Sequence, residues 1–422
     1  MLPGLPPHGF APRAIRSRAG RQRSSSMSSP SACLACPPHK GFPMPLTLTD
    51  DQEMLRESAR GFLGEAAPVS CFRRQRDENR VDAASRDLWR QMASLGWAGI
   101  LVDEEFGGSQ FGFVGAGVLA EEMGRTLSAS PFISTALLAA TAIGRFGSAE
   151  QKARHLPLIA AGEAIHALAV DEGAKHRPEA IAVRAERAGN GFRINGAKRF
   201  VADGTLADQL IVAARSAGAA GDAGGITLFL LDAKAPGITI EPVRLVDSRN
   251  AARIAFADVE ATGGDVLGEI DAGGDVLHGI LNAGRAGLAA ELSGAAQQSF
   301  DVTIDYLKTR QQFGATIGSF QALQHRAAYL YCELQLTRSA VLHALQELDR
   351  DFAAAGPACT LAKAKAGQAA TLAGLEAIQM HGGIGMTDEH DVGLYVKRIR
   401  VAQELYGDPD FQIDRLALAQ GY

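Results

Sequence analysis

Two segments in the C-terminal third of the chain combine residue types that suit an anionic ligand. Residues 309–321 (TRQQFGATIGSFQ) include Arg310, and residues 379–385 (QMHGGIG) include Gly382 and Gly383. A guanidinium has a planar fork that pairs with phosphate oxygens, and glycine lets a backbone approach a ligand closely. The alternative interpretation is structural: Arg310 is then a solvated charge at a helix end, and the glycines form a helix C-cap.

The familiar nucleotide-binding and metal-binding patterns are missing from the sequence. It has no G-x-G-x-x-G fingerprint and no P-loop, so a nucleotide cofactor would have to be held in another way. The Cys33-x-x-Cys36 pair has no second pair, which argues against a zinc site. The five cysteines are too few for a disulfide scaffold.

The elements that would position these segments follow a helix, β, helix order. Thr49 precedes an acidic turn as a helix N-cap does, and apolar residues recur at helical spacing as far as residue 163. Short β-type runs follow at 209–213, 226–231, 238–240 and 253–256, with hairpin turns expected at Asn190-Gly191 and Asn195-Gly196. Helical periodicity returns near Asp275.

This order implies segregated layers and an α+β fold. The predicted domains are a helical N-terminal domain over 44–164, an antiparallel, β-barrel-like middle domain over 165–270 and a C-terminal four-helix bundle over 271–422. No apolar run reaches about 18 residues, so no membrane span is expected.

Charge separates the head of the chain from its body. The chain has 42 basic and 47 acidic residues, a net charge of −5; residues 1–49 hold six of the basic residues and no acid, which leaves −11 for the rest. An acidic body argues against nucleic-acid binding. Residues 1–43 have three interpretations: a disordered tail, an over-extended start before Met27 or Met44, or a targeting peptide. The location expected is the bacterial cytoplasm, or the mitochondrial matrix if the head is a targeting peptide.

Four segments, in order, resemble the acyl-CoA dehydrogenase family: residues 96–108, 196–201, 309–321 and 379–385. The likeness spans about 46–420. It implies the helical, β and four-helix-bundle domains of that family, together with FAD, an acyl-CoA substrate, a homo- or heterotetramer and an electron-transferring flavoprotein as electron acceptor.

The resemblance also assigns site residues. Arg310 corresponds to an arginine that reaches the FAD pyrophosphate of a neighbouring subunit, Phe200 to an aromatic residue beside the flavin, and Arg285 to an arginine near bound CoA. The alternatives are packing or capping roles, and an internal salt bridge for Arg285. The predicted cofactor-binding residues are Arg310, Phe313, Gln321, Gln379, Gly382, Gly383 and Phe200; no metal ligand is predicted.

Several positions depart from the family pattern. Ala202 stands where a Thr or Ser normally donates to the flavin, and residues 171–176 lack the Ser-Asp ending of the family's flavin loop. The usual base, a Glu in a Tyr-Glu-Gly-Thr turn, is replaced by Gly407, and the base position used by other members is Gly284.

Three interpretations of the base follow. Asp408 is the nearest carboxylate, one residue displaced and one methylene shorter, and is the predicted base. Glu291 lies about 10 Å along the helix axis from residue 284, beyond the reach of a direct replacement. The chain would otherwise lack a base. The matching functions are an active acyl-CoA dehydrogenase, a non-catalytic partner subunit that completes a neighbour's FAD site, and a flavin oxidase or monooxygenase on the same fold.

Overall fold

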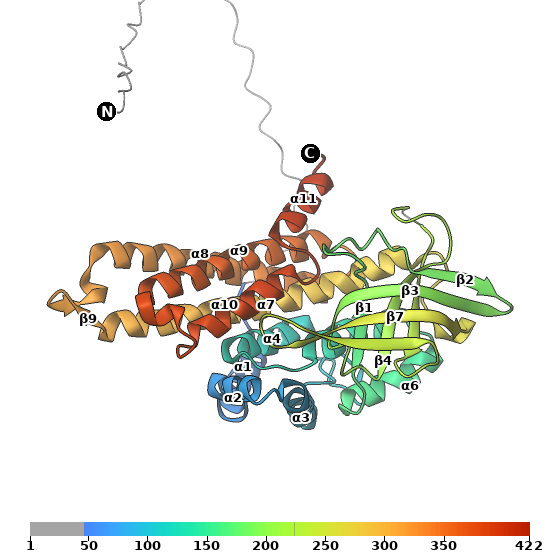
Figure 1. Cartoon of the computed structure of the whole chain (residues 1–422), viewed down its shortest axis with the longest axis horizontal. Helices are drawn as coiled ribbons and strands as arrows, with labels where there is room; N and C mark the ends of the chain where they lie inside the picture. Colours follow the sequence, from blue (N-terminus) through green and yellow to red (C-terminus); the bar gives the residue numbers. More distant parts are fainter. Residues whose placement is uncertain (1–45, 223) are drawn as a thin grey trace, which may run out of the picture. The chain divides into compact units, whose positions relative to one another are not determined.

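The computed structural model describes residues 46–222 and 224–422. The three interpretations of residues 1–43 therefore lie outside the described residues. The described part has helices, then a β-sheet, then long helices, which confirms the predicted α+β class (Figure 1).

The N-terminal helices pack around a buried apolar core. Thr49 forms a capping box with Gln52, in which each side chain bonds the other residue's backbone N–H at 3.3 and 3.0 Å. Leu63, Trp89 and Met92 are fully buried. The helices are α1 (Asp50–Ala66), α2 (Val69–Asp77), α3 (Val81–Ser94), α4 (Phe113–Thr126), a π-helical segment (Phe132–Ala139), α5 (Ala140–Phe146) and α6 (Ala149–Ala160).

The middle of the chain forms one eight-stranded sheet. Its strands are β1 (His166–Ala169), β2 (Arg184–Ala188), β3 (Gly191–Ala202), β4 (Gln209–Arg215), β5 (Ile226–Asp232), β6 (Ile238–Arg244), β7 (Asn250–Ala261) and β8 (Val266–Leu267). They lie in the order β6-β7-β3-β2-β4-β5-β8, with β1 beside β4. Most pairs are antiparallel, as predicted, but β4 runs parallel to both β1 and β2.

One of the two predicted hairpin turns is wrong. The β2–β3 hairpin does form at the first site, but its turn residues are Gly189 and Asn190, one position earlier than predicted, and Gly191 already pairs with Ala188; Asn195-Gly196 lies inside β3. The φ of +134° at Gly196 is accommodated by a register shift against β7, and the Asn195 side chain bonds the neighbouring β7 residue Asp258 at 3.0 and 2.9 Å. The glycine marks a β-bulge rather than a turn.

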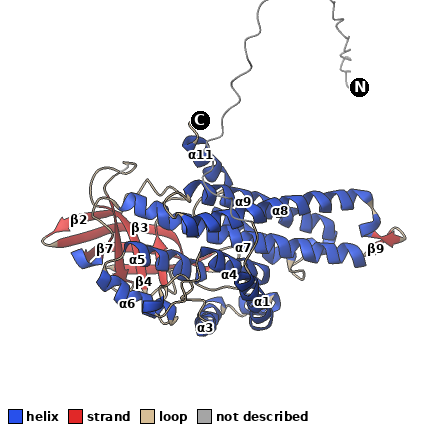
Figure 2. Ribbon diagram, turned by 180° about the vertical axis from the view of Figure 1, so that it is seen from behind, coloured by secondary structure: helices blue, strands red, loops and turns tan. Residues whose placement is uncertain are grey.

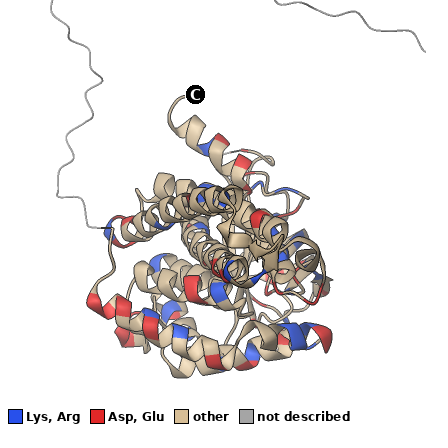
Figure 3. Ribbon diagram, turned by 90° about the vertical axis from the view of Figure 1, so that its left-hand side faces the viewer, with Lys and Arg blue, Asp and Glu red and all other residues tan. Residues whose placement is uncertain are grey.

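The C-terminal part contains the longest helices, as Figure 2 shows from behind. They are α7 (Gly273–Thr309), α8 (Gln321–Arg350), α9 (Gly356–His381), α10 (Val392–Glu404) and α11 (Pro409–Ala419), with a small hairpin, β9 (Gln311–Gln312) and β10 (Ala315–Thr316), joining α7 to α8. Seen from the hairpin end, basic and acidic residues are interspersed along the helices (Figure 3).

Glycines let α4 and α7 cross closely. A Cβ on Gly124 would lie 2.1 Å from the carbonyl oxygen of Glu291, and one on Gly294 would lie 1.8 Å from that of Glu121. The two backbones therefore touch where neither can carry a side chain. Within the described residues, no helix is long and apolar enough to cross a membrane.

Candidate functional site

The predicted site residues fall at two ends of the long helices. Arg285 and Arg310 are both on or directly after α7, and 25 residues separate them, which is about 37 Å along a helix. We call the region around β9 and β10, with the end of α9, the hairpin end. We call the region around Arg285 and the turn at residues 405–408 the packed end.

At the hairpin end the predicted cofactor residues are exposed. Phe313 has φ +55° in the β9–β10 turn, where its side chain is 91% exposed and its ring lies 6.3 Å from that of Phe320. Arg310 caps α7, and its guanidinium has no partner among the residues that the structure describes. Gln321 begins α8 and is also exposed.

The second predicted segment lies at the same end. The ring of His381 at the end of α9 stacks on Tyr306 near the end of α7, with centroids 4.5 Å apart. Gln379 is exposed, and a Cβ on either Gly382 or Gly383 would meet no atom within 4 Å. Burial lowers the pKa of His381, whose Nδ1 lies 2.7 Å from the Ala377 carbonyl oxygen, which fits a structural histidine.

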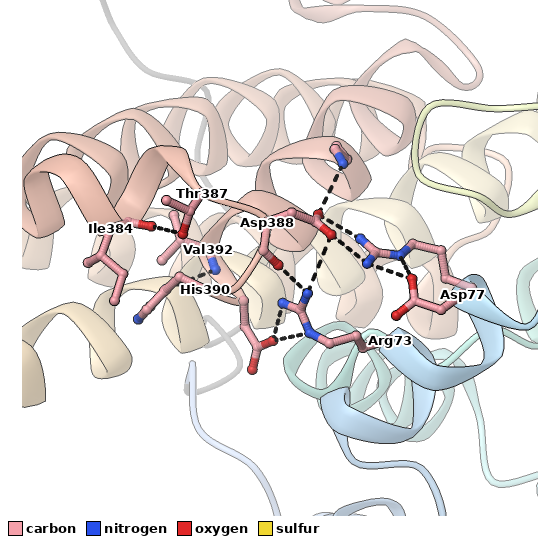
Figure 4. Close-up of polar contacts among 10 residues, drawn as sticks. Arg73, Asp77, Ile384, Thr387, Asp388, His390 and Val392 are labelled. Carbon is pink, nitrogen blue, oxygen red and sulfur yellow. Dashed lines mark hydrogen bonds and ion pairs between the residues drawn. The ribbon is translucent and has the colours of Figure 1, made fainter.

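Ion pairs fasten the loop after these glycines to the N-terminal helices, as Figure 4 shows. Arg73 donates to Asp391 at 2.7 Å, and Arg76 donates to both oxygens of Asp388 at 2.8 and 2.7 Å. The hydrogen bond from Arg76 lowers the pKa of Asp388. The loop therefore has a defined position, although each exposed pair contributes little stability by itself.

At the packed end, buried donors hold the turn that would carry the catalytic base. Arg285, 1% exposed, donates from Nε to the Tyr406 carbonyl at 3.1 Å. Lys363 donates to the Gly407 carbonyl at 3.1 Å, and Gln412 donates to both carbonyls at 2.9 and 3.1 Å. Burial lowers the pKa of Lys363 to about 7 and that of Arg285 to about 10.

Arg285 keeps one free donor. Its Nη1 donates to Asn282 at 2.9 Å, and its guanidinium carbon lies 5.8 Å from the centre of the Phe411 ring. Its Nη2 is buried with no partner among the described residues. A buried, unpaired N–H costs about 1–3 kcal/mol. This nitrogen is therefore suited to donate a hydrogen bond to a ligand oxygen or to a water.

Asp408 is engaged in local structure. It is the N-cap of α11, accepting from the Phe411 backbone at 2.9 Å, and it accepts from Lys175 at 2.7 Å. Burial raises the pKa of Asp408, but the hydrogen bonds from Lys175 and the Phe411 backbone outweigh it and hold the pKa below its ordinary value. A carboxylate with a lowered pKa and two partners is a weak proton acceptor.

Neither glycine at the family's base positions leaves room for a side chain. A Cβ on Gly407, where φ is +105°, would lie 2.4 Å from a ring carbon of Phe411. A Cβ on Gly284 would lie 2.6 Å from a methyl of Leu138. Gly407 is closed by a ring and by its positive φ, whereas a side chain at Gly284 would require the Leu138 side chain to move.

Glu291, the other carboxylate considered, belongs to a buried ion cluster. It accepts two bonds from Arg398 at 2.8 Å each and lies 3.1 Å from Arg249, while Arg398 also donates to Asp247 at 2.9 Å. Burial raises the pKa of Glu291, but the two arginines outweigh it and lower the pKa to about 2. This carboxylate is a structural ion and not a base.

The loop that replaces the family's flavin loop is tied to both neighbouring elements. Glu172 accepts from the buried Lys198 of β3 at 2.6 Å. His176 bonds Asp171 at 2.8 Å, and its ring lies 5.1 Å from that of Phe411. Lys175 and His176 thus connect the loop to the packed end. Sequence reasoning missed this role, because these residues lie more than 200 positions from their partners.

Phe200 lies at an irregularity in β3. Its φ is +52° and its side chain is 44% exposed, beside a register shift between Lys198 and Val201. An aromatic residue at positive φ is rare and marks a position held by its surroundings. The bulge turns the side chain outward on the same strand as Ala202.

Comparison with known proteins agrees with this architecture. Acyl-CoA dehydrogenase N-terminal, middle and C-terminal domain models match residues 49–163, 170–259 and 271–420. The mitochondrial short/branched chain specific acyl-CoA dehydrogenase of Rattus norvegicus is 30% identical over 385 residues, which cover 88% of this chain and 86% of that protein.

Two solved structures have the same fold. The structure of PigA with FAD and proline has a TM-score of 0.82 at 25% identity, covering 90% of this chain and 99% of that one. A variant of the Tcur3481-Tcur3483 steroid ACAD has a TM-score of 0.79 at 29% identity, covering 88% and 98%. With three matched domains in order and a relative aligned over most of both chains, this chain belongs to the acyl-CoA dehydrogenase family of oxidoreductases.

Proposed function

We propose that this chain works in the FAD-dependent α,β-dehydrogenation of an acyl-CoA thioester, with electrons passing to an electron-transferring flavoprotein. The family supports the reaction, and the relative PigA has been solved with FAD. When bound, FAD supplies the hydride-accepting chemistry, while the protein supplies position and electrostatics. Two observations at the hairpin end carry the proposal: the free guanidinium of Arg310 and the open backbone of Gly382 and Gly383, on segments joined by the stacking of His381 on Tyr306.

These residues fit part of a dinucleotide. Arg310 offers a forked donor for a pyrophosphate, Gln321 and Gln379 offer amides, and Phe313 offers an exposed ring. Arg285 lies about 37 Å from Arg310 along α7, so one cofactor that uses both ends would be shared between two chains. We therefore propose an oligomer in which the hairpin end of one subunit completes the cofactor site of another.

At the packed end, this chain's own residues would act on the thioester. The free Nη2 of Arg285 would bind a substrate oxygen, which positions and polarises the group. Asp408 remains the predicted base for an active chain, and to accept a proton it would first have to leave Lys175.

A second function is favoured by the two packed glycines. If no carboxylate reaches the substrate, the chain is a non-catalytic partner subunit that contributes Arg310 to a catalytic neighbour. Gly284 and Gly407 both support this role, because glycine fills each family base position and a side chain there would press on Leu138 or Phe411.

One experiment separates these roles. The chain is purified alone and together with a co-expressed homologous subunit, and FAD content and anaerobic flavin bleaching by acyl-CoA are measured. Flavin bleaching by the chain alone would eliminate the partner role. Bleaching that occurs only in the mixed assembly, and that disappears in the Arg310→Gln variant, would support it. Turnover with oxygen and no other acceptor would favour an oxidase or monooxygenase.

One control variant and one contradicting outcome complete the test. Arg253→Gln removes an exposed arginine of β7 and is expected to leave FAD content unchanged. A chain that contains no FAD in any assembly and binds no acyl-CoA would contradict the proposed function.

A further inference from the structure

A small cavity lies beside the turn at Tyr406. Its volume is about 40 Å³, and it is lined by the π-helical segment, the end of β3 and the segment before β7, through Ser134, Ala202, Asp203 and Arg249. The cavity thus adjoins Ala202, near the exposed Phe200, and the turn that would face the thioester. Its lining is mixed: charged side chains meet apolar ones there, namely those of Ile133, Leu245, Leu288 and Leu405.

Arg249 brings unpaired donors to this cavity. Its side chain is 13% exposed, and its Nη1 lies 3.1 Å from Glu291. Its Nε and Nη2 are buried and have no partner among the described residues. Two buried donors without an acceptor are costly, so an oxygen-bearing group or water is expected against them.

Asp203 brings an acceptor to the same cavity. This residue follows β3 with φ +57°, and the one hydrogen bond that the structure gives its side chain comes from Ser134, whose Oγ donates to Oδ2 at 2.6 Å. Its second oxygen, Oδ1, is left to accept another donor. Burial raises the pKa of Asp203 to about 6. Two residues that line the cavity therefore have unused hydrogen-bonding capacity: an acceptor on Asp203 and two donors on Arg249.

The charges around the cavity and its volume limit which chemical group can occupy it. Three carboxylates in this region share two guanidiniums, so negative charge is in excess. The carboxylates are those of Asp203, Glu291 and Asp247, and the guanidiniums are those of Arg249 and Arg398. A further anion would be repelled, so the matching group is uncharged. A hydroxyl both accepts and donates, whereas a methyl would leave Arg249 and Asp203 unsatisfied. About 40 Å³ suits one or a few groups of water size.

We propose that this cavity recognises a hydroxyl group on the acyl part of the CoA thioester, accepting from Arg249 and donating to Asp203. The inference rests on the proposed function, because it requires an acyl-CoA bound at the packed end. It makes Asp203 and Arg249 specificity-determining residues that select a hydroxyacyl group over a plain alkyl group.

The test measures the dissociation constants of matched thioesters by calorimetry on the FAD-containing assembly. Each hydroxyacyl-CoA is paired with the thioester that has a methyl in place of the hydroxyl: 3-hydroxypropanoyl-CoA with butanoyl-CoA, and 4-hydroxybutanoyl-CoA with pentanoyl-CoA. Since hydrogen bonds to charged groups are the stronger ones, we expect the hydroxyl member of at least one pair to bind roughly ten- to hundredfold more tightly.

Variants of Asp203 test whether this residue causes the preference for the hydroxyl group. Asp203→Leu is expected to abolish the preference while butanoyl-CoA and pentanoyl-CoA still bind, and Asp203→Asn, which preserves the shape, is expected to reduce it. Asp305→Leu, an exposed carboxylate of α7, is the control and should leave the preference unchanged. If Asp203→Leu fails to fold, the Asp203→Asn comparison decides.

The possible failures are distinguishable. Equal affinity within both pairs would mean that the cavity holds only water, and would overturn this inference while leaving the proposed function intact. A preference that survives in Asp203→Asn at full size would also overturn it. If no CoA thioester binds at all, the proposed function fails as well.

Discussion

The hairpin end and the packed end differ in what their polar groups do. At the hairpin end, Arg310, Phe313 and Gln379 are exposed and the glycines border open space. At the packed end, Arg285, Lys363 and Glu291 are buried and bonded to the protein itself. The first region is built to meet something outside the chain, while the second is built to hold its own turn and ion cluster in place.

We therefore expect substitutions at the two ends to change different properties of the protein. Substitutions at the packed end should change mainly the free energy of unfolding, because buried charges and tight packing are lost. Substitutions at the hairpin end should change mainly cofactor content. The predictions below test this division, beginning with the largest expected effect.

Glu291→Gln should destabilise the fold by about 3–5 kcal/mol, because it leaves two buried arginines with weakened pairing. Urea unfolding followed by circular dichroism measures this. Glu376→Gln, which breaks an exposed pair with Arg326 at 2.7 Å, is the control and should cost less than about 1 kcal/mol. Equal losses of unfolding free energy in the two variants would contradict the assignment of a structural role to the packed end.

The same cluster predicts a pH dependence. The pKa of Glu291 is lowered from 4.5 to about 2 in the folded state, so its contribution is present above about pH 4.5 and is lost as the pH falls toward 2. The stability difference between the wild type and Glu291→Gln should therefore shrink over that range. A stability difference that stays constant down to pH 2 would contradict the conclusion that Glu291 is ionised and paired with arginine in the folded state.

Gly407→Glu should cost about 2–4 kcal/mol, from overpacking against Phe411 and from positive φ at a non-glycine residue. The matched control is Gly61→Glu on the exposed face of α1, where a Cβ meets no atom and the change should be neutral or stabilising. A stable Gly407→Glu variant that gains dehydrogenase activity would instead show that the turn can accept a catalytic Glu.

Arg310→Gln should reduce the affinity of the assembly for FAD by roughly ten- to hundredfold, since a charged hydrogen bond to phosphate is lost. The thermal midpoint of the cofactor-free protein should hardly change, because this side chain is exposed. FAD retained after gel filtration measures the first effect and scanning calorimetry the second. Loss of stability without loss of FAD would reverse the assignment of the hairpin end.

Asp408→Asn should have the smallest effect on stability. Asparagine caps helices as well as aspartate does, so we expect less than about 1 kcal/mol of destabilisation. Flavin bleaching should be lost with the fold intact if Asp408 is the base of an active chain, and should be unchanged if the chain is a non-catalytic partner subunit. Lys175→Met should give a similarly small change in stability, because it removes the exposed partner of the same carboxylate.

The sequence by itself determined the fold class and the family. Periodic apolar residues, the Thr49 cap and the order of the segments indicated helices, then a sheet, then long helices, because these signals are local. The family resemblance also singled out Arg310 and Phe200 as predicted site residues, and the two glycine positions without a base. Asn195-Gly196 misled the prediction, since the pairing of β3 with β7, a nonlocal interaction, turned a typical turn sequence into a bulge.

Only the tertiary structure decided how these residues are grouped. It separated Arg310 from Arg285 by most of the length of α7, closed both glycine positions with neighbouring side chains, and joined Lys175 to Asp408 across 233 positions. It also brought Arg249, Asp203 and Ser134 around one cavity, although they come from three separate elements. The physical reason is that burial, pairing and pKa depend on contacts between distant segments, which a sequence pattern does not encode.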